Sequence, residues 1–107
     1  EKIYNMLIDE VCSALPEIKI IILEPFVLKG VVTEEKWGEF RSEVEKRAAA
    51  AKRVADGHGL PFAELQKKFD DAEKLAPADY WLIDGVHPTA AGHELISQEW
   101  IAAFKKL

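Results

Sequence analysis

The chain has 107 residues, of which 49% are hydrophobic and 31% are charged, and its formal net charge is -5 at pH 7. These values fit one folded domain and exclude a disordered chain. The acidic balance, with no basic cluster interleaved with aromatics, argues against binding to nucleic-acid phosphates. The longest aliphatic run, residues 20–23, is far too short to cross a bilayer. We therefore expect neither a nucleic-acid partner nor a membrane partner.

The number of cysteines and the first residues of the chain indicate the cellular compartment of the protein and whether an N-terminal part is missing. Cys12 is the only cysteine, which excludes an internal disulfide and fits a reducing compartment such as the cytoplasm. The chain begins at Glu1, and a helical pattern is already running there, as in a chain cut inside a larger protein. We therefore expect a cytoplasmic protein whose N-terminal part is missing, and secretion stays open for the same reason.

Residues 1–23 predict a helix followed by a strand. Apolar residues recur at helical spacing and give one wide face: Ile3, Tyr4, Leu7, Ile8, Val11, Ala14 and Leu15. Pro16 ends this helix because it lacks the N–H that a further helical turn requires. Residues 18–23 are rich in β-branched side chains and apolar almost throughout, which is typical of a strand covered on both faces.

A long helix and a second strand are predicted next. Thr33 is a suitable N-cap, because two glutamates follow it in the first turn, where the helix dipole favours negative charge. The apolar face of this helix carries Trp37, Phe40, Val44, Ala48, Ala51 and Ala55. The helix is expected to stop near Gly57 and Gly59. Residues 60–63 are a strand candidate that Pro61 limits to a sheet edge or a strand start.

The last third of the chain predicts two helices separated by a loop. Residues 65–72 have the spacing of a short amphipathic helix, and residues 77–83 form a loop with two adjacent aromatics. A final helix begins after Thr89 and runs on Ile96, Trp100, Ala103 and Leu107.

This order of helices and strands indicates an α/β protein with a parallel sheet covered on both faces. Only two strands are visible, whereas a sheet typically has about five or six. Two buried strands cannot satisfy their edges alone. The remaining strands are expected from a missing N-terminal segment or from a partner chain.

Asp84 and His87 carry the chemistry that the sequence suggests. A short loop can fold the Asp84 carboxylate onto one ring nitrogen of His87, which leaves the other nitrogen free to accept a proton. Pro88 favours an extended His87, and Thr89 suits the N-cap of the closing helix. The pattern indicates the acid and base of a hydrolytic triad, although a purely structural hydrogen bond is the simpler alternative.

The stretch Asp84-Gly85-Val86-His87-Pro88-Thr89-Ala90-Ala91-Gly92-His93 resembles the last conserved block of the SGNH hydrolases, the GDSL esterase and lipase family. In that family an Asp-x-x-His-Pro near the C-terminus supplies the triad acid and base. Residues 20–26 and 59–62 resemble family strands as well. The resemblance implies a three-layer, flavodoxin-like α/β/α fold, of which residues 1–107 would be the C-terminal half, with the last two strands and the C-terminal helices.

The resemblance also shows what this chain lacks. The family's nucleophile lies in a Gly-Asp-Ser block, and its oxyanion hole uses a Gly-x-Asn-Asp block; neither occurs in this sequence. The only serines and the only asparagine lie in helical patterns and are expected to be structural: Ser13, Ser42, Ser97 and Asn5. The chain alone is therefore expected to be inactive.

The resemblance implies a carboxylic ester hydrolase in the complete protein, acting on short-chain acyl esters or carbohydrate acetyl esters. It implies no metal and no organic cofactor. Trp81 could line a substrate pocket, or it could simply pack under the loop. A non-catalytic interaction domain that retains the loop is the alternative function. A metal-binding module of Asp84, His87 and His93 is a third hypothesis, weakened because the spacing of the histidines does not match one helix face.

Overall fold

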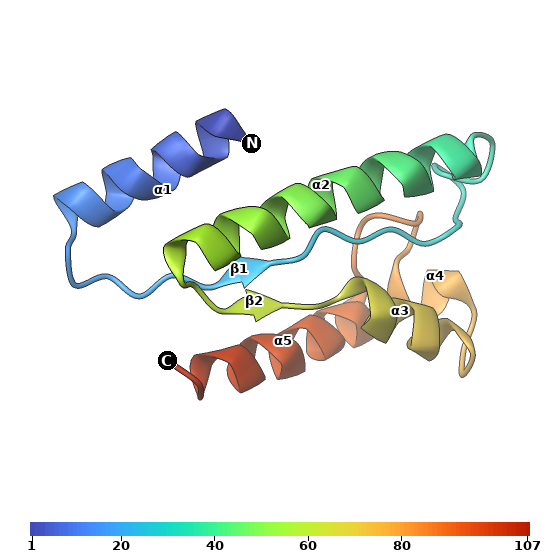
Figure 1. The fold of residues 1–107 in the computed structure, drawn as a ribbon. Coiled ribbons are helices and arrows are strands. Elements are labelled where there is room, and N and C mark those ends of the chain that lie inside the picture. The colour runs from blue at the N-terminus through green and yellow to red at the C-terminus, as the bar shows by residue number, and fades with distance from the viewer.

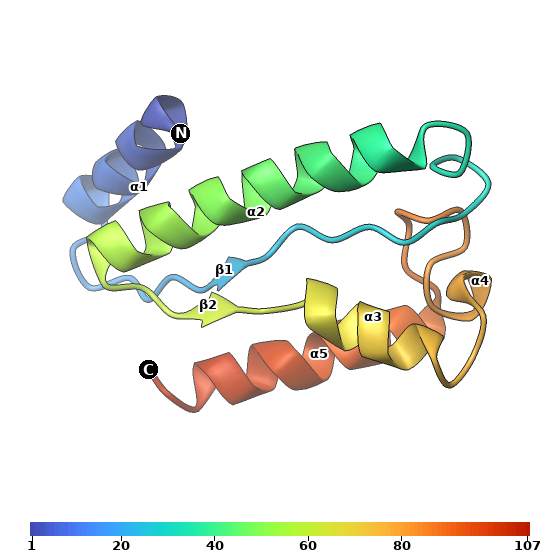
Figure 2. The same cartoon turned by 45° about the vertical axis from the view of Figure 1, so that its right-hand side comes forward.

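Two short parallel strands lie between helices in the computed structural model, which describes residues 1–107 (Figure 1). In chain order the elements are α1 (Lys2–Ala14), β1 (Ile22–Leu23), α2 (Trp37–His58), β2 (Phe62–Ala63), α3 (Gln66–Glu73), α4 (Ala78–Trp81) and α5 (Ala90–Phe104). Helix α2 lies on one side of the strand pair and α5 lies on the other, as both views show (Figure 2). The α/β fold and its parallel strands are as the sequence predicts.

The strands pair over a shorter length than the sequence predicts. Ile22 lies opposite Phe62, and the Ile22 N–H donates to the Pro61 carbonyl at 3.0 Å. In this register the N–H of residue 61 would have to donate to residue 20 to extend the ladder. Pro61 has no N–H, so the ladder begins only at β1 and β2, not at residues 18 and 60.

Two apolar clusters hold the layers together. One joins α1, β1 and α2 through Ile8, Ile22, Ala51, Val54 and Ala55. The other joins the segment after β1 to α3 and to the end of α4 through Leu28, Leu65, Phe69 and Leu82. The Phe69 ring stacks on Phe26 at a centroid distance of 4.6 Å. Burial of a side chain of this size contributes about 1.5–3 kcal/mol to stability. The second cluster therefore fixes Leu82, which lies just before the loop of residues 84–87.

The prediction of Thr33 as a helix N-cap is wrong. Helix α2 begins at Trp37 with Lys36 as its N-cap, and Thr33 lies in the preceding turn, completely buried. The Thr33 hydroxyl donates to the Leu28 carbonyl at 2.6 Å and accepts from the Gly30 N–H at 2.9 Å, so both hydrogen bonds lie within this turn and not at the start of a helix. At its other end α2 continues past Gly57 and ends at Gly59, whose positive φ of 65° suits a glycine.

Part of the predicted loop 77–83 is a short helix. Pro77 precedes α4 with a φ of -57°, which is compatible with entry into a helix. After α4 the chain becomes extended at Leu82 and forms an isolated antiparallel bridge with Pro88. This bridge closes the loop that carries Asp84 and His87.

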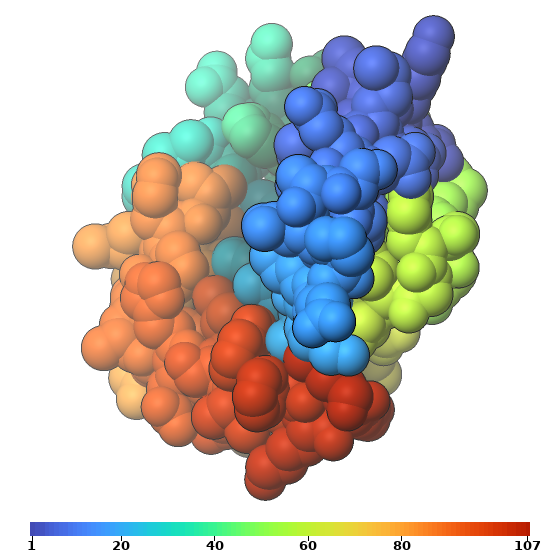
Figure 3. All heavy atoms as spheres, turned by 90° about the vertical axis from the view of Figure 1, so that its left-hand side faces the viewer, coloured from blue at the N-terminus to red at the C-terminus, as the bar shows by residue number.

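Helix α1 lies beside the C-terminal end of α2 (Figure 3). Ile8 is its one buried residue, and two ion pairs join its exposed side to α2: Glu1 with Arg53, and Asp9 with His58 at 2.9 Å. Exposed ion pairs contribute little to stability because water screens them, so the attachment of α1 depends mainly on Ile8 and its neighbours. None of the helices is long and apolar enough to cross a membrane.

The contact between His58 and Asp9 predicts a pH-dependent contribution to stability. The Val54 carbonyl, and then the Asp9 carboxylate, raise the pKa of His58 above its ordinary 6.5. This contribution is fully present below the unfolded pKa and is lost as pH rises through the folded pKa. The free energy of unfolding lost in His58→Gln should therefore be larger at about pH 5.5 than at about pH 8.5. A loss that is equal at both pH values in urea titrations would contradict this.

Candidate functional site

Asp84 and His87 lie in the loop between α4 and α5, and their side chains are in contact. His87 Nδ1 and Asp84 Oδ2 are 2.6 Å apart. The other carboxylate oxygen of Asp84 accepts from the Val86 N–H at 3.0 Å and from the His87 N–H at 2.8 Å. Aspartate favours this local turn because its short side chain reaches N–H groups two and three residues ahead. The backbone of the loop therefore orients the carboxylate independently of the imidazole.

The same hydrogen bonds determine the charge of Asp84 and the tautomer of His87. The N–H groups of Val86 and His87, followed by the His87 ring, lower the pKa of Asp84 to about 2. An ionised carboxylate can only accept, so His87 Nδ1 carries the proton and Nε2 of the neutral ring has the free lone pair. The His87 side chain is 75% exposed, whereas that of Asp84 is 20% exposed. The pair therefore presents a basic nitrogen to the surface.

The backbone of this loop is bound to the segment that follows β1. The Leu28 N–H donates to the Gly85 carbonyl at 2.9 Å, and the Val32 N–H donates to the Asp84 carbonyl at 3.1 Å. Gly85 has a φ of 102°, a conformation that favours glycine. Because β1 leads into this segment, the pair is held at the carboxyl end of β1, where active sites of α/β sheets lie.

Thr89 caps α5, as the sequence predicts. Its side chain accepts from the Gly92 N–H at 3.1 Å and donates to the Tyr80 carbonyl at 2.6 Å. A Cβ on Gly92 would collide with the Trp81 carbonyl, so only glycine allows α5 to approach α4 this closely. Thr89 thereby joins the end of α4 to the start of α5 directly behind His87.

Trp81 packs beneath the loop. Its ring contacts the cluster of Leu28, Leu65, Phe69 and Leu82, and its indole N–H donates to the Ala76 carbonyl at 3.2 Å. This is the structural role that the sequence left open beside substrate binding. A contact between Trp81 and a substrate stays a prediction.

The structure does not bring Asp84, His87 and His93 together as a group that could hold a metal ion. His93 is exposed in the first turn of α5, and the structure contains no group of three or more His, Cys, Asp or Glu side chains that could hold an ion. The metal-binding hypothesis therefore finds no support.

No nucleophile lies beside His87 in this chain. Ser13, Ser42 and Ser97 are exposed on α1, α2 and α5, and Asp84 is the only hydrogen-bond partner of the His87 ring. Asn5 is also within α1, where its amide donates to the Glu1 carbonyl. The site holds an acid and a base alone.

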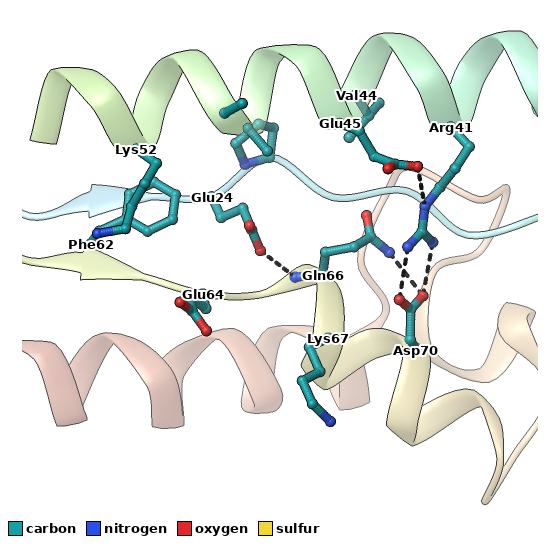
Figure 4. A pocket seen from close by; sticks show the side chains of 13 residues that line it. Glu24, Arg41, Val44, Glu45, Lys52, Phe62, Glu64, Gln66, Lys67 and Asp70 are labelled. Atoms are coloured by element: carbon teal, nitrogen blue, oxygen red, sulfur yellow. Dashed lines mark hydrogen bonds and ion pairs between the residues drawn. The ribbon is translucent and has the colours of Figure 1, made fainter. Parts of the chain in front are cut away.

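A pocket of about 450 Å³ lies between α2 and α3, and no residue of the Asp84 loop lines it (Figure 4). Three of its charged side chains are joined by hydrogen bonds, in which Arg41 binds both Glu45 and Asp70. Arg41 makes two hydrogen bonds to Asp70, at 3.0 and 2.9 Å, and Glu24 accepts from the backbone N–H of Leu65 and Gln66. These contacts join α3 to α2 and to the end of β1, which is a structural role.

The depressed pKa of Asp84 predicts a stability contribution that acid removes. A carboxylate with a lowered pKa stabilises the fold above its unfolded pKa, and this stabilisation is lost as pH falls through the folded pKa, about 2 for Asp84. At about pH 5 the Asp84→Asn variant should therefore unfold at a lower urea concentration than the wild type. The difference between the two midpoint concentrations should become smaller towards about pH 3. Asp79→Asn is the control, because the exposed Asp79 side chain makes no hydrogen bond. A difference between the unfolding midpoints that does not change with pH would contradict the lowered pKa of Asp84.

Comparisons with known proteins bear on the family and the fold of the chain. The sequence profile of the GDSL-like lipase/acylhydrolase family matches residues 1–95. The fold is similar to that of a Parabacteroides merdae protein described as a GDSL-like lipase, with 32% identity and a TM-score of 0.83 over 92% of this chain. It is also similar to LAE5, an α/β hydrolase from the metagenome of Lake Arreo, Spain, with 25% identity and a TM-score of 0.72 over 94% of this chain. A comparison with curated protein sequences finds no match.

Both structural relatives are about twice as long as this chain. The match covers 45% of the Parabacteroides merdae protein and 45% of LAE5. The two parallel strands and their helices therefore correspond to part of a hydrolase domain. On the profile match and the shared fold, the chain belongs to the GDSL-like lipase/acylhydrolase family.

Proposed function

We propose that this chain is the C-terminal half of an ester hydrolase domain and supplies its acid and base, Asp84 and His87. The observation that carries the proposal is the 2.6 Å contact between His87 Nδ1 and Asp84, because it leaves Nε2 as a free base at the surface. Family membership supports the assignment of this pair to acyl chemistry rather than to a structural role.

In the proposed reaction a serine outside residues 1–107 attacks the ester carbonyl. His87 Nε2 accepts the serine proton and passes it to the leaving alcohol, while the Asp84 carboxylate stabilises the imidazolium. Water then releases the acyl group, and His87 acts as base a second time. These steps need no metal or organic cofactor from this half of the domain. We propose short-chain acyl esters or carbohydrate acetyl esters as substrates.

The free edge of β1 supports the proposal that another half completes the domain. The N–H groups of Ile22 and Glu24 point towards β2, so the backbone of the alternate residues, Ile21 and Leu23, points towards the opposite edge. No strand of this chain covers that edge. A nucleophile-bearing half that adds parallel strands there would satisfy these backbone groups.

Apolar side chains on α5 support the same arrangement. Trp100 and Phe104 stack at a centroid distance of 5.3 Å and remain 42% and 54% exposed. Large aromatic side chains in a stacked pair normally lie in a core or an interface. We propose that the missing half covers them.

A non-catalytic interaction domain is the second candidate, favoured by the lack of a serine beside His87 in this chain. The coding sequence that precedes Glu1, or the sequence of any chain that co-purifies with this one, distinguishes the two. A Gly-Asp-Ser block there would exclude the interaction domain, and its absence from both would exclude the hydrolase.

In the complete domain His87→Ala should lower the kcat for hydrolysis of p-nitrophenyl acetate by roughly 10⁴- to 10⁶-fold, as expected when a triad base is lost. His93→Ala is the matched control, because His93 is exposed and its side chain makes no hydrogen bond. It should retain most of the activity. Near-normal activity in His87→Ala, or an equal loss in His93→Ala, would contradict the assignment of His87 as the base.

A further inference from the structure

Thr33 is a completely buried polar residue whose hydroxyl closes the turn formed by residues 28–33. It donates to the Leu28 carbonyl at 2.6 Å and accepts from the Gly30 N–H at 2.9 Å. A buried hydroxyl with both kinds of partner stabilises one conformation of the turn, because any other would leave buried groups unpaired. Thr33 is thus the centre of this turn rather than the start of a helix.

The same turn also binds the backbone of Asp84 and Gly85. The hydrogen bonds come from both ends of the turn, from the N–H of Leu28 to the Gly85 carbonyl and from the N–H of Val32 to the Asp84 carbonyl. The same turn whose shape depends on Thr33 therefore holds the residue that orients His87.

Two glycines allow the turn and the loop to touch without a side chain between them. A Cβ on Gly30 would lie 2.5 Å from the Asp84 carbonyl carbon, and a Cβ on Gly85 would lie 2.7 Å from Thr33 Oγ1. Such contacts would force the backbones apart. The Thr33 hydroxyl, the turn and the Asp84 backbone consequently form one packed unit.

We propose that Thr33 is a positioning residue for the Asp84–His87 pair. The local hydrogen bonds within residues 84–87 orient the carboxylate towards the imidazole, and the Thr33 turn fixes that loop against the carboxyl end of β1. Without the hydroxyl the loop samples other conformations, and the contact between Asp84 and His87 Nδ1 is populated for less of the time. The effect of Thr33 on catalysis rests on the proposed function, whereas its effect on the contact between Asp84 and His87 does not.

The tautomer of His87 tests the inference directly in this chain. Thr33→Val removes the hydroxyl and keeps the shape of the side chain, whereas Thr33→Ser keeps the hydroxyl. Ring nitrogen chemical shifts of neutral His87 should report the Nδ1–H form in the wild type and in Thr33→Ser. In Thr33→Val they should move towards the Nε2–H form that a histidine side chain prefers in water, and the amides of Leu28 and Val32 should lose protection from hydrogen exchange.

Val54→Ala is the control for general loss of stability, because Val54 is buried in the other apolar cluster. It should leave the His87 tautomer unchanged. A tautomer that is unchanged in Thr33→Val, or that moves equally in Val54→Ala, would overturn the inference.

In the complete domain, the loss in Thr33→Val should appear in kcat rather than in KM, on the order of 10²-fold. Thr33→Ser should restore most of it. A change confined to KM would also overturn the positioning role. If the complete domain hydrolyses no ester, the proposed function fails, while the tautomer measurement still decides the role of Thr33.

Discussion

The carboxylate of Asp84 accepts three hydrogen bonds, two from backbone N–H groups of its own loop and one from the imidazole of His87. The backbone donors keep the carboxylate ionised and oriented, so the imidazole meets a charge whose position is already set. The backbone of the same residue is bound by the turn after β1. The basic nitrogen of His87 therefore has its position relative to the sheet fixed by contacts that lie entirely within this chain.

The sheet itself is only partly formed by these residues. Helices α2 and α5 cover two strands, yet β1 has a partner along one edge, and Trp100 and Phe104 are exposed on α5. A base and an acid that are preorganised at the carboxyl end of β1, a strand with one unpaired edge, fit the proposal that additional strands bring the nucleophile. In the proposed active site, this part of the fold supplies the acid and the base, and the other part supplies the nucleophile.

Local chemistry explains which features could be predicted from the sequence. The contact between Asp84 and His87 and the Thr89 cap involve hydrogen bonds within a few residues, so the residue types at that spacing were sufficient. The strand ends depended on Pro61 in the partner strand. Thr33 has the right chemistry for a cap, but its hydroxyl binds the Leu28 carbonyl in a turn that packs on a loop far along the chain. Sequence spacing does not reveal such a contact.

The role of Asp84 and His87 as the acid and base of an ester hydrolase is tested most directly by covalent labelling of the complete domain with a fluorophosphonate, followed by intact mass measurement and peptide mapping. We expect one phosphonyl group on a serine outside residues 1–107, since an activated serine must lie within hydrogen-bond reach of His87 Nε2. This label should be absent from the His87→Ala variant. A label on Ser13, Ser42 or Ser97, or none in the wild type, would contradict the assignment of this chain as the acid–base half of an ester hydrolase.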